Sequence, residues 1–317
     1  MDLFQEVKLA RQRIRDFVRC TRLIRSPHYS DKLSANIYFK CENLQTTGSF
    51  KLRGAFNKFL SLDDSVRSLG VVAASTGNHG RGVAHAAREL NSSCTIFAPA
   101  DSDQNKLDAM RALGAEIKLI EGDCINAESA ARKNSEQSGR CYIAPYNDPV
   151  VVAGQGTIGL ELNEQLDQMD AIFVATGGGG LISGIAAAVK QKHPDCVHVA
   201  CSPSNSNVMI QSLDAGRILD APSEPTLSDA TAGGVEADSV TFDFCQQYVD
   251  RTVSVDESEI ARCLKQFIDV HSMLIEGSAA VAIAAMEQVA DELAGKNVVV
   301  VLCGANIGSE KLAKVLQ

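Results

Sequence analysis

Short apolar runs alternate along most of the chain with segments whose apolar residues recur at helical spacing. The runs predict buried strands at 71–74, 94–98, 116–120, 171–175, 197–201 and 297–302. The other segments predict helices at 81–90, 105–113, 125–138, 159–166, 182–191, 256–270 and 277–293, with a short one at 208–213 in a loop-rich stretch. Buried strands that alternate with helices are typical of parallel sheets covered by helices on both faces.

The periodicity is interrupted near the middle of the chain by Pro145, Asp148 and Pro149. A length of 317 residues also exceeds the roughly 250 to 300 residues at which single cores stop growing. We therefore predict an α/β protein of two lobes, each an open, mostly parallel sheet flanked by helices. We expect residues 1–60 and 148–317 to form the large domain and residues 61–147 a small, mobile domain.

Composition and charge narrow the class of ligand. Apolar residues make up 45% of the chain and charged residues 22%, as in an ordinary soluble enzyme with a sizeable core. The formal net charge of -9 opposes binding to nucleic acid or to an anionic membrane, because phosphate groups attract clusters of Lys and Arg. No stretch approaches the roughly 20 apolar residues of a membrane-spanning helix. The expected partner is a small molecule.

Cysteine usage indicates a reducing compartment. The chain has no C-x-x-C pair, and several cysteines lie in apolar runs, where reduced thiols behave as small core residues. Residues 1–18 lack the apolar core and cleavage site of a signal peptide. We therefore expect a cytoplasmic protein. The ten cysteines are at positions 20, 41, 94, 124, 141, 196, 201, 245, 263 and 303.

Three segments carry candidate chemistry: TGSFKLRGA around Lys51, STGNHG from Ser75 to Gly80, and TGGGGL from Thr176 to Leu181. Pyridoxal 5'-phosphate needs an amine with which to form an imine, backbone N–H groups for its phosphate and polar contacts for its ring. A lysine among glycines is by itself more often a surface residue. The combination of the three segments nevertheless points to this cofactor.

The glycine run favours a phosphate site over a dinucleotide site. Four glycines between a buried strand and a helix let the backbone approach an anion at a helix N-terminus. A nicotinamide fingerprint G-x-G-x-x-G would end at Ile182 or Ser183 instead of glycine, and no acid follows strand 197–201. The chain also lacks the H-E-x-x-H, paired-cysteine and G-x-S-x-G patterns of zinc enzymes and hydrolases.

The STGNHG segment has two interpretations. It follows a predicted strand and precedes a helix, so its polar residues suit a simple N-cap turn. The same hydroxyls, amide and glycines also offer enough donors to bind a carboxylate at the edge of the sheet. We expect His79 to be structural, because that role is the commoner one for a histidine in this setting.

In chain order, GSFKLRGA (48–55), STGNHG (75–80), AGQGT (153–157), GGGGL (177–181) and LCGAN (302–306) resemble the motifs of the serine/threonine dehydratase (threonine ammonia-lyase) and serine racemase family. The resemblance spans nearly the whole chain. Members of this family are fold-type II pyridoxal-phosphate enzymes with a tryptophan synthase β-like fold. The resemblance implies that the large domain binds the cofactor and that the small domain carries the asparagine loop 75–80.

The resemblance also implies roles for single residues. Lys51 would hold the cofactor as an imine and then take the α-proton of the substrate, and Thr76 is the second catalytic candidate. Ser75, Thr76 and Asn78 would bind the substrate carboxylate. Asn78 would also contact the 3'-oxygen of the cofactor, and Cys303 the pyridine nitrogen. The expected cofactor-binding residues are Phe50, Lys51, Asn78, Gly177, Gly178, Gly179, Gly180, Leu181 and Cys303.

The reaction implied is loss of the α-proton and β-hydroxyl from L-threonine or L-serine, giving a 2-oxo acid and ammonia. Serine racemisation is the alternative, but racemases have serine where this chain has Thr76. A specialised 3-hydroxy amino acid dehydratase would show the same cofactor motifs. From other classes, a nicotinamide-dependent oxidoreductase is disfavoured by its broken fingerprint, and a catalytically silent relative by the retained motifs. We expect a homodimer, the prior for this family and for soluble oligomers.

Two departures from the family bear on regulation. Ser202 and Val208 stand where racemase-like members supply a glutamate and an aspartate to a divalent cation, so we expect no metal site. The chain ends soon after its last predicted strand. We therefore expect neither the regulatory domain of biosynthetic threonine deaminases nor feedback inhibition by isoleucine.

Overall fold

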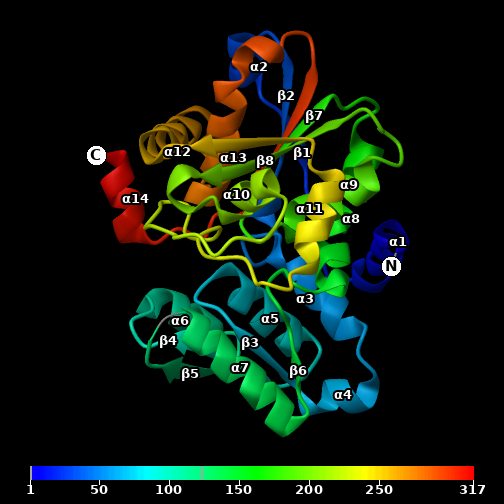
Figure 1. The fold of residues 1–317 in the computed structure, drawn as a ribbon, viewed down its shortest axis with the longest axis vertical. Helices are drawn as coiled ribbons and strands as arrows, with labels where there is room; N and C mark the ends of the chain where they lie inside the picture. The colour runs from blue at the N-terminus through cyan, green and yellow to red at the C-terminus, as the bar shows by residue number, and fades with distance from the viewer. Residues whose placement is uncertain (1, 123) are drawn as a thin grey trace.

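The computed structural model describes residues 2–122 and 124–317, which form two sheets with helices packed around them (Figure 1). The six-stranded sheet has the order β1 (Leu23–Arg25), β2 (Asn36–Lys40), β10 (Asn297–Val301), β7 (Ala171–Ala175), β8 (Val197–Pro203) and β9 (Arg251–Val255). The four-stranded sheet has the order β5 (Glu116–Ile120), β4 (Cys94–Pro99), β3 (Val71–Ala74) and β6 (Cys141–Tyr142).

The helices follow the strands in alternation over much of the chain. The N-terminal half contains α1 (Leu3–Ile14), α2 (Pro27–Leu33), α3 (Lys51–Leu60), α4 (Asp64–Leu69), α5 (Asn78–Glu89), α6 (Gln104–Arg111), α7 (Cys124–Ser138) and α8 (Pro149–Gln165). The C-terminal half contains α9 (Gly180–Val189), α10 (Val208–Ala215), α11 (Val240–Tyr248), α12 (Glu257–His271), α13 (Gly277–Gln288) and α14 (Ser309–Leu316). Short 3-10 turns are η1 (Glu42–Leu44), η2 (Ser204–Ser206) and η3 (Ala290–Glu292).

The strand pairing confirms the predicted two-lobed, mostly parallel α/β fold. Every pair in the four-stranded sheet is parallel, and in the six-stranded sheet only β1 runs antiparallel to its neighbour β2. Parallel strands need crossover connections, which the intervening helices supply. The carboxyl ends of the strands therefore lie together at one edge of each sheet, the usual place for ligands in open α/β sheets.

The predicted strands agree with the structure to within two residues, but two predicted helices have wrong bounds. The helix expected at 277–293 ends at Gln288. We expected a helix at 159–166, whereas α8 begins at Pro149. The Asp148 side chain accepts a hydrogen bond from the Val150 N–H, and Pro149 occupies the first helical turn. The residues that interrupt the hydrophobic pattern are thus the start signal of α8. The AGQGT segment lies inside this helix and not in a loop.

The glycines of α8 are explained by close helix packing. A Cβ atom on Gly154 would lie 2.6 Å from the Cα of Gly54 in α3, and one on Gly156 would lie 2.7 Å from the Gly184 carbonyl oxygen in α9. Larger residues would therefore push the three helices apart. Helix α8 holds α3 on one side and α9 on the other, and both of these helices begin at the site described below.

A buried ion network also fixes α3. The Arg53 guanidinium donates to both carboxylate oxygens of Glu42, at 2.8 Å each, and to those of Glu161, at 2.6 and 3.0 Å. Lys40 donates to Glu161 at 2.6 Å. All four side chains are buried. Because two positive and two negative groups are mutually bonded, no charge of this set is left unpaired, and β2, η1, α3 and α8 are joined.

None of the helices in the described parts of the chain is long and apolar enough to cross a membrane.

We predict that Arg53→Met lowers the free energy of unfolding by about 3–5 kcal/mol, because it leaves the buried Glu42 carboxylate without a cationic partner and Glu161 with Lys40 alone. Urea denaturation of the cofactor-free protein measures this loss. Arg11→Met is the matched control, because Arg11 pairs with Glu164 of the same helix α8 on the surface and should cost below about 1 kcal/mol. Equal losses in the two variants would contradict the role given to the buried network.

Candidate active site

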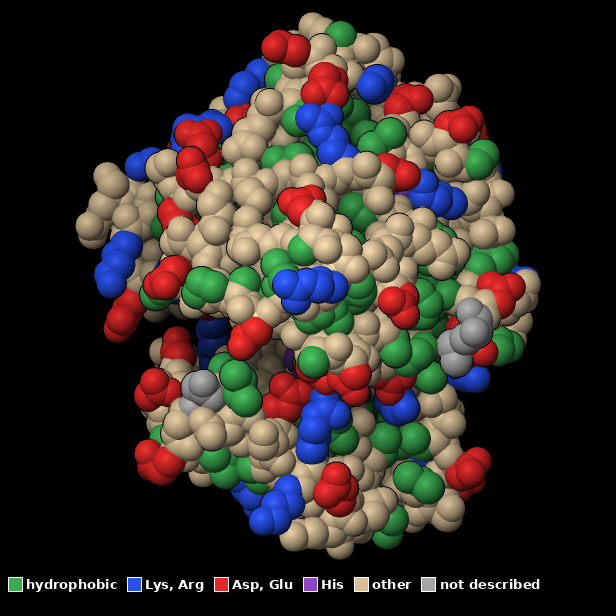
Figure 2. Space-filling model, viewed as in Figure 1, with side chains coloured by type: hydrophobic (Ala, Val, Ile, Leu, Met, Phe, Trp, Pro, Cys, Tyr) green, Lys and Arg blue, Asp and Glu red, His purple; other side chains and the backbone are tan. Residues whose placement is uncertain are grey.

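A pocket lies between the two sheets, where Figure 2 shows a hollow between the upper and lower parts of the molecule. It is lined by all the residues expected to bind the cofactor, together with residues that the sequence did not single out. The expected residues in its wall are Phe50, Lys51, Asn78, Gly177, Gly178, Gly179, Gly180, Leu181 and Cys303. The structure thus brings together segments that lie more than 200 residues apart in the chain.

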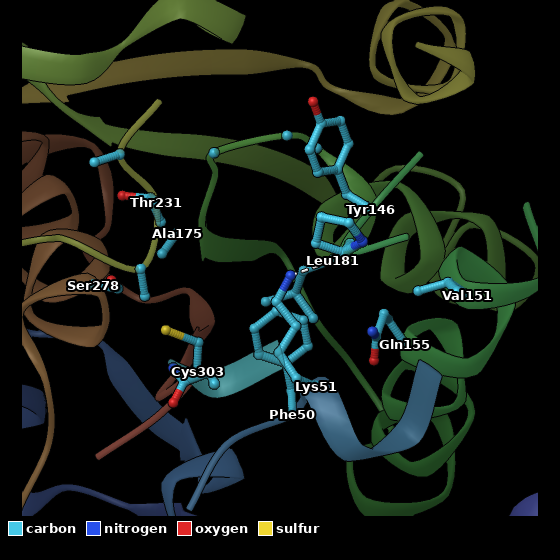
Figure 3. A pocket seen from close by; sticks show the side chains of 18 of the residues that line it. Phe50, Lys51, Tyr146, Val151, Gln155, Ala175, Leu181, Thr231, Ser278 and Cys303 are labelled. Atoms are coloured by element: carbon cyan, nitrogen blue, oxygen red, sulfur yellow. Dashed lines mark hydrogen bonds between the residues drawn. The ribbon is translucent and has the colours of Figure 1, made fainter. Parts of the chain in front are cut away.

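Lys51 is the first residue of α3, and its side chain lies near the centre of the pocket (Figure 3). Its amine donates a hydrogen bond to the Pro145 carbonyl oxygen at 2.7 Å and lies 5.3 Å from the centre of the Phe50 ring. Burial lowers the pKa of the Lys51 amine to about 8. A substantial fraction of this amine is therefore neutral near physiological pH, as imine formation requires.

The glycine run forms a concave loop between β7 and α9. Gly179 has a φ of 80°, in the left-handed region that only glycine adopts without strain. A Cβ atom on Gly178 would lie 2.3 Å from the Tyr146 ring, so the close contact with this ring also requires glycine. The first turn of α9 follows directly, and its N–H groups have no acceptor within the helix. This arrangement fits a phosphate group.

Asn78 is held by a buried carboxylate that sequence analysis missed. Its amide nitrogen donates to the two Glu276 carboxylate oxygens at 2.8 and 3.1 Å, and its amide oxygen accepts from Asn306 Nδ2 at 2.6 Å. The Asn306 backbone N–H donates to Glu276 at 3.0 Å. Both ends of the Asn78 amide are therefore engaged, which fixes its orientation in the pocket.

Glu276 and Cys303 have pKa values displaced by burial. Burial, reinforced by the charge of Asp229, raises the pKa of Glu276 to about 7 against the hydrogen bonds from Asn78 and Asn306. Burial and the charge of Glu276 raise the pKa of the Cys303 thiol well above its ordinary value, so this thiol stays protonated. A neutral thiol fits a pyridine nitrogen that carries no proton.

Ser75 and Thr76 belong to the loop between β3 and α5 but do not line the pocket. The Ser75 hydroxyl accepts a hydrogen bond from the Gly77 N–H at 3.1 Å, as in a turn. Their roles toward the substrate stay predictions. His79 is buried, its ring Nε2 lies 2.8 Å from the Ile143 carbonyl oxygen, and burial with the charge of Lys51 lowers its pKa to about 3.

Sequence analysis missed five residues of the pocket wall with polar side chains: Tyr146, Gln155, Thr231, Glu276 and Ser278. A signal for Glu276 was present, since it is a single acid after the apolar pair Leu274-Ile275 and just before the buried alanine-rich helix α13. Gln155 lay in a quoted motif without a role. For Tyr146 the sequence carries no signal that distinguishes it from an ordinary loop aromatic.

In the described residues no cluster of His, Cys, Asp and Glu is arranged to hold a metal ion. The Ser202 hydroxyl donates to the Thr176 carbonyl oxygen at 2.6 Å, at the end of β8 next to the glycine loop. This hydrogen bond therefore links the end of β8 to the residue that follows β7.

We predict that Glu276→Gln changes the pH dependence of folding. Because the folded-state pKa of about 7 exceeds the ordinary value of 4.5, the wild-type free energy of unfolding should fall as pH rises from 4.5 to 7, and the variant should lack this fall. Thermal unfolding of the cofactor-free proteins across this range measures the difference.

Glu287→Gln is the control of opposite sign. Burial raises the pKa of the Glu287 carboxyl, but hydrogen bonds from Lys32 and Arg262 lower it by more, so its pKa lies below the ordinary value. Its contribution to stability is therefore present above pH 4.5 and is lost as pH falls. A Glu276→Gln curve parallel to the wild-type curve would contradict the assignment.

Comparisons with known proteins agree with this geometry. The family model described as "Pyridoxal-phosphate dependent enzyme" matches residues 14–304. The chain is 38% identical to an L-threonine ammonia-lyase of Thermotoga maritima over 317 residues, 100% of this chain and 78% of that protein. It is 32% identical to a serine racemase of Schizosaccharomyces pombe over 313 residues, covering 99% and 97% of the two chains.

A solved structure agrees in fold as well. The processed form of threonine deaminase isoform 2 from Solanum lycopersicum superposes with a TM-score of 0.94 at 36% sequence identity, covering 99% of this chain and 92% of that one. The amine, the glycine loop and the neutral thiol each fit a part of pyridoxal 5'-phosphate. The chain belongs to the family of pyridoxal-phosphate dependent enzymes.

Proposed function

We propose that this enzyme converts L-threonine or L-serine to the corresponding 2-oxo acid and ammonia. The observation that carries the proposal is the buried, partly neutral Lys51 amine between a phosphate-binding loop and the fixed Asn78 amide. The similarity of the chain to an L-threonine ammonia-lyase and to a threonine deaminase supports the same reaction.

Pyridoxal 5'-phosphate, when bound, supplies an electron-withdrawing ring that stabilises the electron pair left on the α-carbon after proton loss. Lys51 Nζ removes that proton, because it is the pocket's amine and its lowered pKa leaves it free to accept one near neutral pH. The Phe50 ring packs beside this amine. The hydroxyls of Ser75 and Thr76 and the backbone N–H of Asn78 hold the substrate carboxylate. The β-hydroxyl then leaves as water together with one proton, which balances the proton that Lys51 Nζ takes up. Hydrolysis of the resulting enamine consumes one water and gives the 2-oxo acid and ammonia.

Serine racemisation is the second candidate, since the chain is similar to a serine racemase along nearly its whole length. Racemisation needs a proton donor on the face of the substrate opposite Lys51. The hydroxyl proposed for that place is on Thr76, whose extra methyl group restricts its side-chain torsion compared with serine. We therefore rank elimination above racemisation.

We also propose that residues 61–147 move as a small lobe relative to 1–60 and 148–317. Side chains of the four-stranded lobe reach across the pocket: Lys106 pairs with Asp229 at 2.9 Å, and Arg132 pairs with Glu236 at 2.7 Å. These pairs suit a closed arrangement that excludes water from the site. Small-angle scattering with and without a substrate analogue would detect the opening, and an unchanged radius of gyration would argue against it.

The assembly and location are further proposals. We infer a homodimer, for which Leu44 and Leu274 offer apolar surface, each with more than 40% of its area exposed. The Asn43 side chain donates to the Leu274 carbonyl oxygen, which places the two leucines on neighbouring segments. Light scattering of the purified protein measures the mass. The chain has ten cysteines and no C-x-x-C pair, which supports a cytoplasmic location; fractionation of the host cell would test it.

We predict that the protein loaded with pyridoxal 5'-phosphate forms 2-oxobutanoate from L-threonine and pyruvate from L-serine. Lys51→Ala should lower kcat/KM by at least about 100-fold, because it removes the base and the covalent anchor. Lys58→Ala is the matched control on the same helix, since Lys58 pairs with Asp148 away from the pocket and should leave activity near the wild-type value.

Chiral chromatography of the same reactions separates the two candidates. D-serine formed faster than pyruvate would favour racemisation. If Lys51→Ala keeps both the elimination and the racemisation activity, the role of Lys51 as the base is contradicted. A parallel assay with 3-hydroxyaspartate tests the specialised dehydratase.

A further inference from the structure

One polar atom of the pocket wall, Nε2 of Gln155, has no role in the proposed reaction. Gln155, in the AGQGT segment of α8, is only 2% exposed, and its side-chain nitrogen Nε2 has no hydrogen-bond acceptor. Among the described residues of the pocket wall, it is the one side chain with a fully buried nitrogen or oxygen that lacks a partner. A buried amide N–H₂ without an acceptor is costly, so an unsatisfied one in a ligand pocket indicates a missing ligand atom.

The orientation of this amide is fixed by its other end. Gln155 Oε1 accepts a hydrogen bond from the Gly54 N–H at 3.1 Å. Reversing the amide would set its N–H₂ group against that N–H donor, so only one orientation is possible. Gly54 is the fourth residue of α3, the helix that begins with Lys51. The Gln155 oxygen therefore caps the helix that carries Lys51, and its nitrogen is left to donate.

The position of Gln155 indicates which part of the cofactor would accept a hydrogen bond from its Nε2. Figure 3 shows Gln155 and Cys303 on opposite sides of Lys51, so Gln155 is far from the pyridine nitrogen expected at Cys303. The next residue, Gly156, packs against Gly184 in the second turn of α9. Gln155 lines the same pocket as Gly180 and Leu181, which begin that helix. The first turn of α9 continues the glycine loop. On the side of Lys51 away from Cys303, the acceptor expected is the phosphate group.

Two other side-chain donors of the wall are already engaged within the chain. The Lys51 amine donates to the Pro145 carbonyl oxygen, and the Asn78 amide donates to Glu276. The glycine loop itself offers only backbone N–H groups. A buried phosphate dianion needs several donors to replace its hydration, and a charged acceptor strengthens each hydrogen bond. Gln155 Nε2 supplies a donor of this kind from a side chain.

We propose that Gln155 is a phosphate-binding residue of this enzyme, which donates through Nε2 to the phosphate of pyridoxal 5'-phosphate while its oxygen caps α3. The inference rests on the cofactor assignment and adds a residue to it. It links phosphate binding to the helix that begins with Lys51, because one rigid amide contacts both.

The test compares cofactors with and without the phosphate. Equilibrium binding of pyridoxal 5'-phosphate and of pyridoxal to the cofactor-free protein is measured from the visible absorbance of the bound form. Gln155→Glu keeps an oxygen for the Gly54 N–H but replaces the donor with an acceptor. It should weaken pyridoxal 5'-phosphate binding by about 10- to 100-fold and leave pyridoxal binding unchanged.

Inorganic phosphate binding to the cofactor-free protein, followed by calorimetry, should weaken in the same variant. Gln165→Glu is the matched control, because it makes the same change on the same helix outside the pocket and should alter neither cofactor's affinity. Gln155→Met removes the donor without adding charge and should show a smaller loss that is again confined to the phosphorylated cofactor.

Equal weakening of both cofactors by Gln155→Glu would overturn the proposal and leave Gln155 as a structural cap of α3. Unchanged binding of both would overturn it as well. Circular dichroism checks that each variant is folded. If Gln155→Glu does not fold, the comparison of the two cofactors is made with Gln155→Met instead. Failure of the wild-type protein to bind pyridoxal 5'-phosphate would instead contradict the cofactor assignment.

Discussion

Burial of the Lys51 amine is the constraint on which the site depends. An ammonium group away from water is costly, so the pKa of this amine falls to about 8, and its neutral form becomes available as nucleophile and base. The amine stays buried because α3 begins at Lys51 and α8 packs against α3 through facing glycines. The ion network around Arg53, two residues further along, fixes the same helix. The first turn of α3 therefore contains both the reactive amine of Lys51 and Arg53, whose ion network holds the helix in place.

The same desolvation acts on the other titratable groups of the pocket. The pKa of the Glu276 carboxyl is raised to about 7, and that of the Cys303 thiol is raised as well. Every group is thus displaced toward its neutral form, and fixed charge is small where the reaction takes place. In such surroundings the backbone N–H groups of the glycine loop and the first turn of α9 interact strongly with an anion. The pocket is therefore suited to hold a phosphate and to move protons with little solvent.

Strands β3, β4, β5, β7, β8 and β10 and the parallel α/β class could be predicted from the sequence, because buried apolar runs leave clear local signals. The residues expected at the cofactor came from the glycine-rich motifs and the family resemblance, and they line one pocket. The position of the AGQGT segment was not predicted. Its glycines are helix breakers in isolation and are tolerated only because Gly54 and Gly184 of neighbouring helices pack against them. Strands β1, β2, β6 and β9 and helix α11 were also missed. The residues of β9 are only partly buried apart from Val255, so they lack a strong hydrophobic run.

The polar residues of the pocket show the same limit. Glu276 acts through Asn78 and Asn306, which are 198 and 30 residues away in the chain, and no local pattern encodes such contacts. Gln155 was visible in the sequence as part of a motif, but its unpaired nitrogen is evident only when Gly54 is seen to occupy the other end of its amide. Long-range hydrogen bonds are set by tertiary packing and must be read from the structure.

The central claim is that one lysine, Lys51, holds the cofactor. Reduction of the loaded protein with borohydride, followed by proteolysis and mass spectrometry, tests it directly because reduction makes the attachment permanent. The account predicts the mass of a reduced pyridoxal phosphate group on the peptide that contains Lys51 and on no other lysine. A group found on a different lysine, or on none, would contradict it.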